Sequence, residues 1–180
     1  DNLAKGSVYE VQVQAVEGDE VSDWTSTVHF TTAVELPYSY GFENKDLTAD
    51  GWVLLQGKTH PNTGIGGNGS IHGYGRTGET FVSYYGYPGN YLLSPVLKNG
   101  TNDVVVVSFW YRELFDGGYE KILVGYTTDE YQTDASKFTY GEVVTASTSW
   151  QEYNHDFPVG TKRIAIKYVY TNAYYLFLDD

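Results

Sequence analysis

Residues 104–111, Val104-Val105-Val106-Val107-Ser108-Phe109-Trp110-Tyr111, form an apolar run that is interrupted by a single serine. β-Branched and aromatic side chains favour strands, and a short apolar run with no helical spacing predicts a β-strand. From Val104 to Phe109 apolar side chains fall on both faces, so we expect this strand to be covered on both sides. The stretch therefore predicts a packed β-sheet at the centre of the fold.

Further strands are predicted on either side of this run, separated by clusters of Gly, Asn and Asp. Many short strands joined by such turns are typical of a β-sandwich or jelly roll, and 18 Tyr and 20 Gly residues favour strands and turns over helices. In residues 163–170 apolar and more polar side chains alternate, which predicts one buried face and one partly solvated face. The predicted fold class is all-β, with strands at 81–85, 91–97, 104–111, 121–126, 138–144, 150–157, 163–170 and 174–179.

The first part of the chain has a different pattern. Residues 8–16 alternate apolar and polar side chains, as a half-buried strand does, and residues 28–32 follow at hairpin distance. Two strands do not make a stable domain alone. We therefore divide the chain into a partial domain, residues 1–33, and a complete β-domain, residues 34–180.

Charge and composition exclude several classes of partner. The chain has 23 acidic and 11 basic residues, a formal charge of −12 that disfavours nucleic acid and anionic lipid but leaves cations such as Ca²⁺ open. It has no Cys, hence no disulfide and no thiolate site. No apolar run approaches the roughly 20 residues that span a bilayer, so no membrane insertion is expected. The chain contains no Met and begins without a signal peptide, from which we expect it to belong to a longer multidomain protein.

Catalytic motifs are missing from the sequence. The histidines do not have metal-ligand spacing, and no serine lies in a Gly-x-Ser-x-Gly turn. The glycine-rich stretch 59–78 lacks the Gly-Lys-Ser or Gly-Lys-Thr end of a phosphate-binding loop and is interpreted as a long loop. Nothing marks a cleft with two opposed carboxylates, which glycoside hydrolysis requires. We predict that the chain is not an enzyme; its histidines are His29, His60, His72 and His155.

The first segment resembles the end of a fibronectin type III domain. Leu3 precedes Tyr9 by six residues, as a Leu precedes the tyrosine-corner Tyr in that family, although Lys5 replaces the usual Pro. Trp24 and the sequence Phe30-Thr31-Thr32 fit the last hairpin of the family. The resemblance implies that residues 1–33 are the last two strands of such a domain.

The second segment resembles the cleaved adhesin domains of gingipain-type proteases and the related choice-of-anchor modules of bacterial secreted proteins. The resemblance implies a Ca²⁺-supported jelly-roll sandwich, extracellular or at the cell surface, that serves in adhesion or as an accessory to an enzyme. It also implies that the last strand continues beyond Asp180. Four motifs in the family's order carry it: Tyr40-Gly41-Phe42-Glu43-Asn44 followed by Asp50-Gly51-Trp52, Tyr91-Leu92-Leu93-Ser94-Pro95, Val107-Ser108-Phe109-Trp110-Tyr111, and Leu176-Phe177-Leu178-Asp179-Asp180.

Three carboxylates are the candidate metal ligands. In the resembled family the first and last strands lie side by side, which implies that Glu43 lies near Asp179 or Asp180. Ca²⁺ takes six to eight oxygen ligands and commonly recruits several carboxylates, so we expect a structural Ca²⁺ site there. Asn44 and Asp50 are weaker candidates for the same site.

Two functions remain open from the sequence. The first is a non-catalytic adhesion or accessory module of a larger secreted or cell-surface protein, with a host protein as partner. The alternative is a carbohydrate-binding accessory module of a secreted hydrolase, with a glycan as partner, since aromatic faces suit sugar stacking. The aromatic candidates for such stacking are Tyr84, Tyr85, Tyr87, Trp110, Tyr119 and Tyr131.

Overall fold

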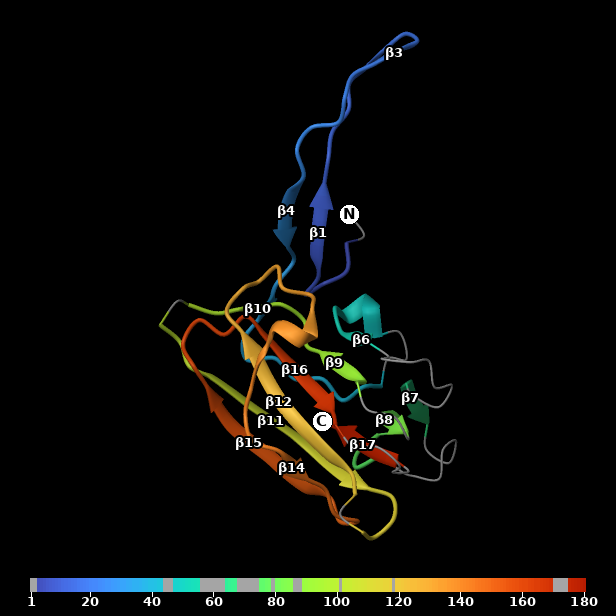
Figure 1. Cartoon of the computed structure of the whole chain (residues 1–180), viewed down its shortest axis with the longest axis vertical. Helices are drawn as coiled ribbons and strands as arrows, with labels where there is room; N and C mark the ends of the chain where they lie inside the picture. Colours follow the sequence, from blue (N-terminus) through green and yellow to red (C-terminus); the bar gives the residue numbers. More distant parts are fainter. Residues whose placement is uncertain are drawn as a thin grey trace.

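The computed structural model describes residues 3–43, 47–55, 64–67, 75–78, 80–85, 89–100, 102–117, 119–169 and 175–180. Figure 1 shows two packed β-sheets and a long β-hairpin arm that projects from one end. Within the described ranges, helix is limited to two short 3₁₀ turns, η1 (Leu47–Asp50) and η2 (Ala135–Lys137). The predicted all-β sandwich is confirmed.

One sheet has five strands, all antiparallel to their neighbours, and the apolar run 104–111 lies in it. The strand that contains most of this run pairs with a neighbour on each side. Phe109 is opposite Tyr153 on one side, and Trp110 is opposite Asp179 on the other. In spatial order the strands are β15 (Gln151–Phe157), β11 (Val105–Glu113), β17 (Tyr175–Asp179), β8 (Thr80–Tyr85) and β7 (Gly64–Gly67).

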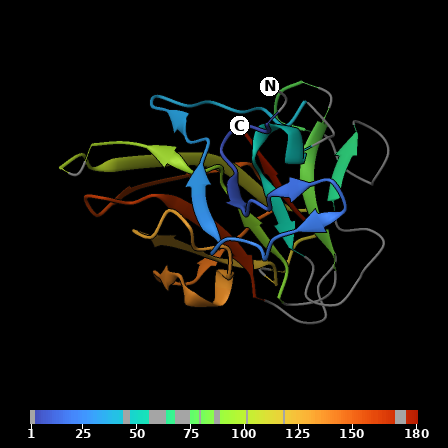
Figure 2. The same ribbon diagram turned by 90° about the horizontal axis from the view of Figure 1, so that it is seen from above.

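The other sheet lies against it (Figure 2). Its central strand, residues Arg163–Tyr168, is almost entirely buried. A short parallel pair, β5 (Val34–Glu35) and β10 (Leu97–Lys98), lies beside the two sheets. The spatial order is β13 (Thr139–Tyr140), β12 (Lys121–Thr127), β16 (Arg163–Tyr168), β9 (Tyr91–Leu93) and β6 (Val53–Leu55), with β14 (Val144–Thr145) also paired to β12.

The core fills the space between the sheets. Leu92, Ile122 and Tyr168 from one sheet and Leu176 and Leu178 from the other are at most 1% exposed and belong to one apolar cluster. Burial of this apolar surface is the main stabilising contribution to the sandwich. The segments on either side of η1 add an aromatic group, whose neighbouring rings lie 5.3–6.1 Å apart: Tyr38, Tyr40 and Phe42 before it and Trp52 after it.

The structure corrects two predictions about burial. The expectation that residues 104–109 are covered on both sides is wrong, because Val104 and Val106 are 53% and 62% exposed. Alternate residues of β11, such as Phe109, face the core, and the opposite face is open along this half of the strand. The expectation of a partly solvated face on residues 163–170 holds only in part: Lys167 and Val169 are half-buried, but a small second cluster that includes Phe138 covers Ala165 on the side away from the main core.

Two predicted strands are broken in the structure. Residues 91–97 divide into β9 and β10, because Pro95 has no N–H to donate and Ser94 uses its side-chain oxygen to accept the N–H of Ile164. Residues 138–144 contribute only β13 and the first residue of β14, separated at Gly141. Both breaks occur where Pro or Gly interrupts the ladder.

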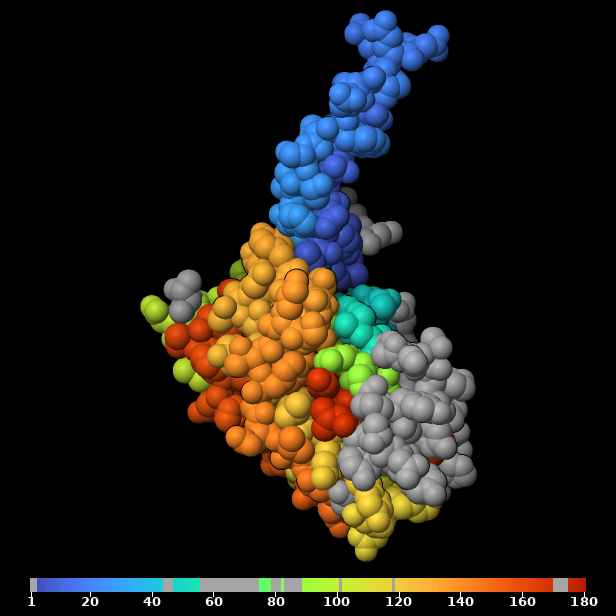
Figure 3. Space-filling model, in the orientation of Figure 1, coloured from blue at the N-terminus to red at the C-terminus, as the bar shows by residue number. Residues whose placement is uncertain are grey.

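The arm is the predicted N-terminal hairpin, and it stands clear of the sandwich (Figure 3). Its base pairs β1 (Val8–Val11) with β4 (Val28–Thr31), and its tip pairs β2 (Val16–Glu17) with β3 (Glu20–Val21). The single strand predicted at 8–16 is therefore interrupted. Between the two ladders, side chains replace backbone acceptors: the N–H groups of Val13 and Ala15 donate to the hydroxyls of Thr25 and Ser22.

Two glycines fix the root of the arm on the sandwich. Gly6 has φ +63°, its carbonyl accepts the N–H of Val96 at 2.8 Å, and a Cβ on it would lie 2.2 Å from Pro95 Cβ. Gly51 has φ +79°, and a Cβ there would lie 2.0 Å from the carbonyl oxygen of Lys5. Both positions combine a left-handed backbone with a contact too close for any side chain.

Candidate functional site

A buried carboxylate at the end of β17 organises the first part of the site. Asp179 is fully buried, and its Oδ2 accepts the backbone N–H groups of Arg76 at 2.6 Å and Thr77 at 3.0 Å. Burial raises the pKa of Asp179, because it disfavours the charged form, and the two N–H donors oppose this effect. The carboxylate thus holds segment 75–78 against the end of the strand.

The neighbouring carboxylate binds the side chains of the same segment. Asp180 Oδ2 lies 2.6 Å from Arg76 Nη1, and Oδ1 accepts the Thr77 hydroxyl at 2.5 Å. Both groups of this ion pair are partly exposed. Arg76 therefore supplies a positive charge where the sequence predicts a cation.

Glu43 reaches segment 75–78 from the other end of the domain sequence. A Cβ on Gly78, which has φ +61°, would lie 1.8 Å from Glu43 Oε1, so that carboxylate is packed against the glycine backbone. A Cβ on Gly41 would lie 3.8 Å from Asp180 Oδ1. Glu43, Asp179 and Asp180 thus each contact one short segment, residues 75–78.

The three carboxylates do not form one tight cluster. Among the described residues, no three His, Asp or Glu side chains lie close enough together to hold a metal ion. Asp50 accepts the Tyr40 hydroxyl at 2.8 Å, which gives it a structural role. Asn44 lies outside the described residues.

The outer face of the five-stranded sheet carries the second part of the site. On β11, Trp110 and Arg112 point away from the core, since Phe109, Tyr111 and Glu113 are buried on the other side. Glu152 of β15 is opposite Trp110, and Trp150 immediately precedes that strand on the same face. The guanidinium carbon of Arg76 lies 3.9 Å from the Trp110 ring centroid, so segment 75–78 connects both parts.

Arg112 has an unusual environment for a cation. Its guanidinium carbon lies 5.2 Å from the ring centroids of both Trp150 and Phe177. Its Nε is buried without a hydrogen-bond partner, and none of the ion pairs among the described residues involves it. Partial burial lowers its pKa. A half-desolvated guanidinium between aromatic rings is a donor suited to an external oxygen ligand.

Other residues singled out from the sequence are dispersed. Tyr119 and Tyr131 are exposed, the second beside His29 of the arm at 5.8 Å between ring centroids. His155 lies on β15 against Phe157. Outside the described residues or side chains lie Tyr84, Tyr85, Tyr87, His60, His72 and most of the glycine-rich stretch 59–78.

Sequence reasoning missed Arg76, Arg112 and Trp150. Arg112 follows Trp110 by two residues within a predicted strand, a spacing that places both on one face and was available as a signal. Arg76 had no such signal, because its contacts with Trp110 and Asp180 join parts of the chain far apart in sequence.

A jelly-roll-like β-sandwich with an aromatic and polar outer face defines a class of adhesion and binding modules. Within that class, the chain belongs to the Cleaved Adhesin Domain family, whose sequence profile matches residues 25–180. No curated protein matches the chain.

Solved structures share the fold. The K1 cleaved adhesin domain of Lys-gingipain from Porphyromonas gingivalis W83 superposes with a TM-score of 0.62 at 23% identity, covering 78% of this chain and 92% of that one. The K3 domain of the same protein gives 0.61 at 23% identity, with 78% and 92% covered. The module TmCBM61, solved in complex with beta-1,4-galactotriose, gives 0.53 at 17% identity, covering 78% and 90%. The expected cleaved adhesin fold is confirmed.

Among the described residues, no helix is long and apolar enough to cross a membrane.

Proposed function

We propose that this domain is a non-catalytic adhesion module of a larger secreted or cell-surface bacterial protein, acting on the extracellular side. The observation that carries the proposal is the family match over residues 25–180. The absence of a catalytic motif from the sequence and the partly exposed polar and aromatic side chains on the outer face of β11 and β15 support it.

The test is a binding assay on the purified chain. Immobilised chain is exposed to purified extracellular-matrix proteins and to a panel of oligosaccharides, and each bound ligand is recovered and analysed. Saturable binding with recovery of unchanged ligand supports the proposal. A ligand that is recovered cleaved, or no binding to either panel, contradicts it.

We also propose that Ca²⁺ supports the fold around Glu43, Asp179 and Asp180. The donor set is chemically suitable, because carboxylate oxygens are the ligands that Ca²⁺ prefers, and a bound cation offsets the cost of the buried charge of Asp179. In the structure, the positive charge of Arg76 partly neutralises the neighbouring carboxylate of Asp180.

The calcium proposal predicts a thermal shift. A ligand that binds only the folded state raises the melting temperature, by several degrees when it is near 100 times its Kd. Differential scanning calorimetry in CaCl₂ and in EDTA measures it, with Asp129→Asn as a control carboxylate change at an exposed site. An equal melting temperature in both buffers for the unaltered chain contradicts a calcium role.

For residues 1–33 we propose the last two strands of a fibronectin type III domain. Tyr9 donates its hydroxyl to the carbonyl of Ala4 at 3.3 Å, as a tyrosine corner does, and stacks on Phe30. The arm exposes apolar side chains, such as Val28 at 60% and Trp24 at 59%, which a companion sheet would cover. Fusion to the natural upstream sequence is expected to shift Trp24 fluorescence to shorter wavelength; unchanged emission contradicts this proposal.

A glycan-binding role is the second candidate function. It is favoured by the group formed by Trp110, Arg112, Trp150 and Glu152, and by the fold shared with TmCBM61. Aromatic rings beside hydrogen-bonding side chains are the usual composition of a sugar site.

A further inference from the structure

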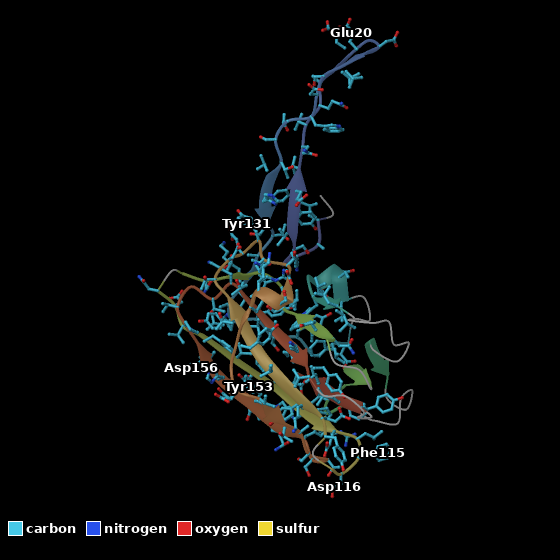
Figure 4. All side chains as sticks on the ribbon, viewed as in Figure 1. Glu20, Phe115, Asp116, Tyr131, Tyr153 and Asp156 are labelled. Atoms are coloured by element: carbon cyan, nitrogen blue, oxygen red, sulfur yellow. The ribbon has the colours of Figure 1, made fainter. Side chains whose placement is uncertain are left out.

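The end of the sandwich opposite the arm carries two exposed aromatic residues in the connection that follows β11, and near the end of β11 the guanidinium of Arg112 lies against the ring of Trp150. We define the aromatic pole as Arg112, Phe115, Tyr119 and Trp150. Phe115 and Tyr119 belong to the connection between β11 and β12 and are 55% and 52% exposed. Figure 4 shows Phe115 and Asp116 at the far end of the molecule from Glu20, which marks the arm tip.

The pole is held in place by packing beneath it. Leu114 and Trp150 pack against Tyr175 and Phe177 of β17, which are at most 9% exposed. The ring of Tyr119 lies on the backbone of Gly117, where a Cβ would come within 2.2 Å of it. Two backbone N–H groups, those of Tyr119 and Glu120, donate to the buried carboxylate of Glu113. The rings are therefore positioned by the scaffold, which lowers the entropic cost of binding.

The polar groups around the pole complement hydroxyl ligands. Arg112 offers guanidinium donors, while Glu152 and Asp116 are exposed carboxylates that accept hydroxyl hydrogens. Sugars present both groups together, with C–H faces that stack on aromatic rings. A purely apolar ligand would leave the desolvated Arg112 without a partner.

Charge decides which sugars fit. The chain carries a formal charge of −12, and two exposed side chains close in sequence to Phe115 and Trp150, those of Asp116 and Glu152, are acidic. Repeated anionic groups on a ligand would be repelled by this surface. Neutral oligosaccharides are not repelled by this surface, and their hydroxyl oxygens still accept hydrogen bonds from Arg112.

We propose that the aromatic pole binds neutral oligosaccharides, with Trp150 and Tyr119 as stacking surfaces and Arg112 as the hydrogen-bond donor. The proposal rests on the binding role above and names its ligand class and residues. None of the residues of the aromatic pole is among Glu43, Asp179 and Asp180, so the proposal does not depend on a bound cation.

Calorimetric titration with three probes tests the proposal: beta-1,4-galactotriose and xylotriose as neutral chains, and trigalacturonate as an acidic one. Binding of at least one neutral trisaccharide, with trigalacturonate at least about tenfold weaker, is expected. Trp150→Ala and Tyr119→Ala are each expected to weaken that binding about tenfold or more, and Arg112→Lys to weaken it because the planar fork is lost.

Trp24→Ala is the matched control, since Trp24 is an exposed tryptophan on the arm. It is expected to leave the Kd unchanged. Trp150 also packs on Phe177, so circular dichroism melts accompany each variant, and Tyr119→Ala decides the outcome if Trp150→Ala unfolds.

Tighter binding of trigalacturonate, or neutral binding that Tyr119→Ala and Arg112→Lys leave intact, overturns the proposal. Failure of all three sugars while the chain still binds matrix protein also overturns it and leaves the adhesion role standing. Failure of both assays removes the adhesion role as well.

Discussion

At the scale of single residues, Asp179 links stability to pH. Its folded-state pKa is raised above the ordinary 3.8, so the folded state binds more protons than the unfolded state between these two values. The contribution of Asp179 to the free energy of unfolding is therefore expected to rise as pH falls from neutral through the raised pKa towards 3.8.

The comparison of the unaltered chain with Asp179→Asn isolates this contribution. Urea unfolding at several pH values is expected to show the unaltered chain gaining stability relative to the variant as the solution is acidified, in metal-free buffer. A difference that stays constant from neutral pH to below 3.8, or that grows in the opposite direction, shows that burial does not dominate at this carboxylate.

Gly51 provides a second test at this scale. Gly51→Ala places a Cβ in a left-handed backbone and 2.0 Å from the carbonyl of Lys5, so about 1–2 kcal/mol of backbone strain is joined by about 1–3 kcal/mol of displaced packing. Gly18→Ala is the control, because Gly18 has φ +61° but nothing within 4 Å. Urea denaturation measures both, and equal losses would show that the root of the arm is not tightly packed.

At the scale of elements, the backbone amides of the arm and of the central strands are expected to differ in their protection from hydrogen exchange. A two-residue ladder and a few neighbouring backbone and side-chain hydrogen bonds hold β2 and β3, whereas β16 is paired on both sides and buried. Hydrogen exchange is governed by local opening, so amides of residues 16–21 are expected to exchange fast and those of 164–168 only near global unfolding.

Mass-spectrometric exchange of the intact chain checks this difference. The amides of β11, which pair with β15 and β17, serve as an internal reference for the core. Arm amides as slow as those of β11 would mean that the hairpin has a partner surface, for example in a second copy of the chain.

The elements also show how far the sequence could predict this molecule. Apolar and aromatic patterns located β8, β11, β12, β15 and β17, and in the second half of β11 buried residues alternate with half-buried ones. For β16 these patterns found the strand but could not show that a turn around η2, distant in sequence, covers Ala165 on the second face. They failed for Val106, because a run of valines does not reveal which face another element covers.

The candidate site was predictable to a smaller extent. The approach of Glu43 to the end of β17 followed from the family resemblance, since no spacing relates residue 43 to residue 179. Arg76 and Arg112 were missed because their importance depends on which rings lie beside them in space. The sequence suggested Trp110 as a ring for sugar stacking, but in the structure the guanidinium of Arg76 lies over that ring.

At the scale of the whole molecule, the arm and the aromatic pole lie at opposite ends of the sandwich (Figure 4). A module attached through the arm would present the pole outwards, away from its neighbour. The family match supports a binding module, and we propose that it binds its ligand without changing it.

The most direct test is to incubate the chain with the tightest-binding ligand from the two panels and to measure both bound ligand and reaction products over time. The account predicts saturable binding, full recovery of intact ligand, and no effect of Glu43→Gln on product levels. Products that accumulate in proportion to the protein and disappear in a folded Glu43→Gln variant would contradict it.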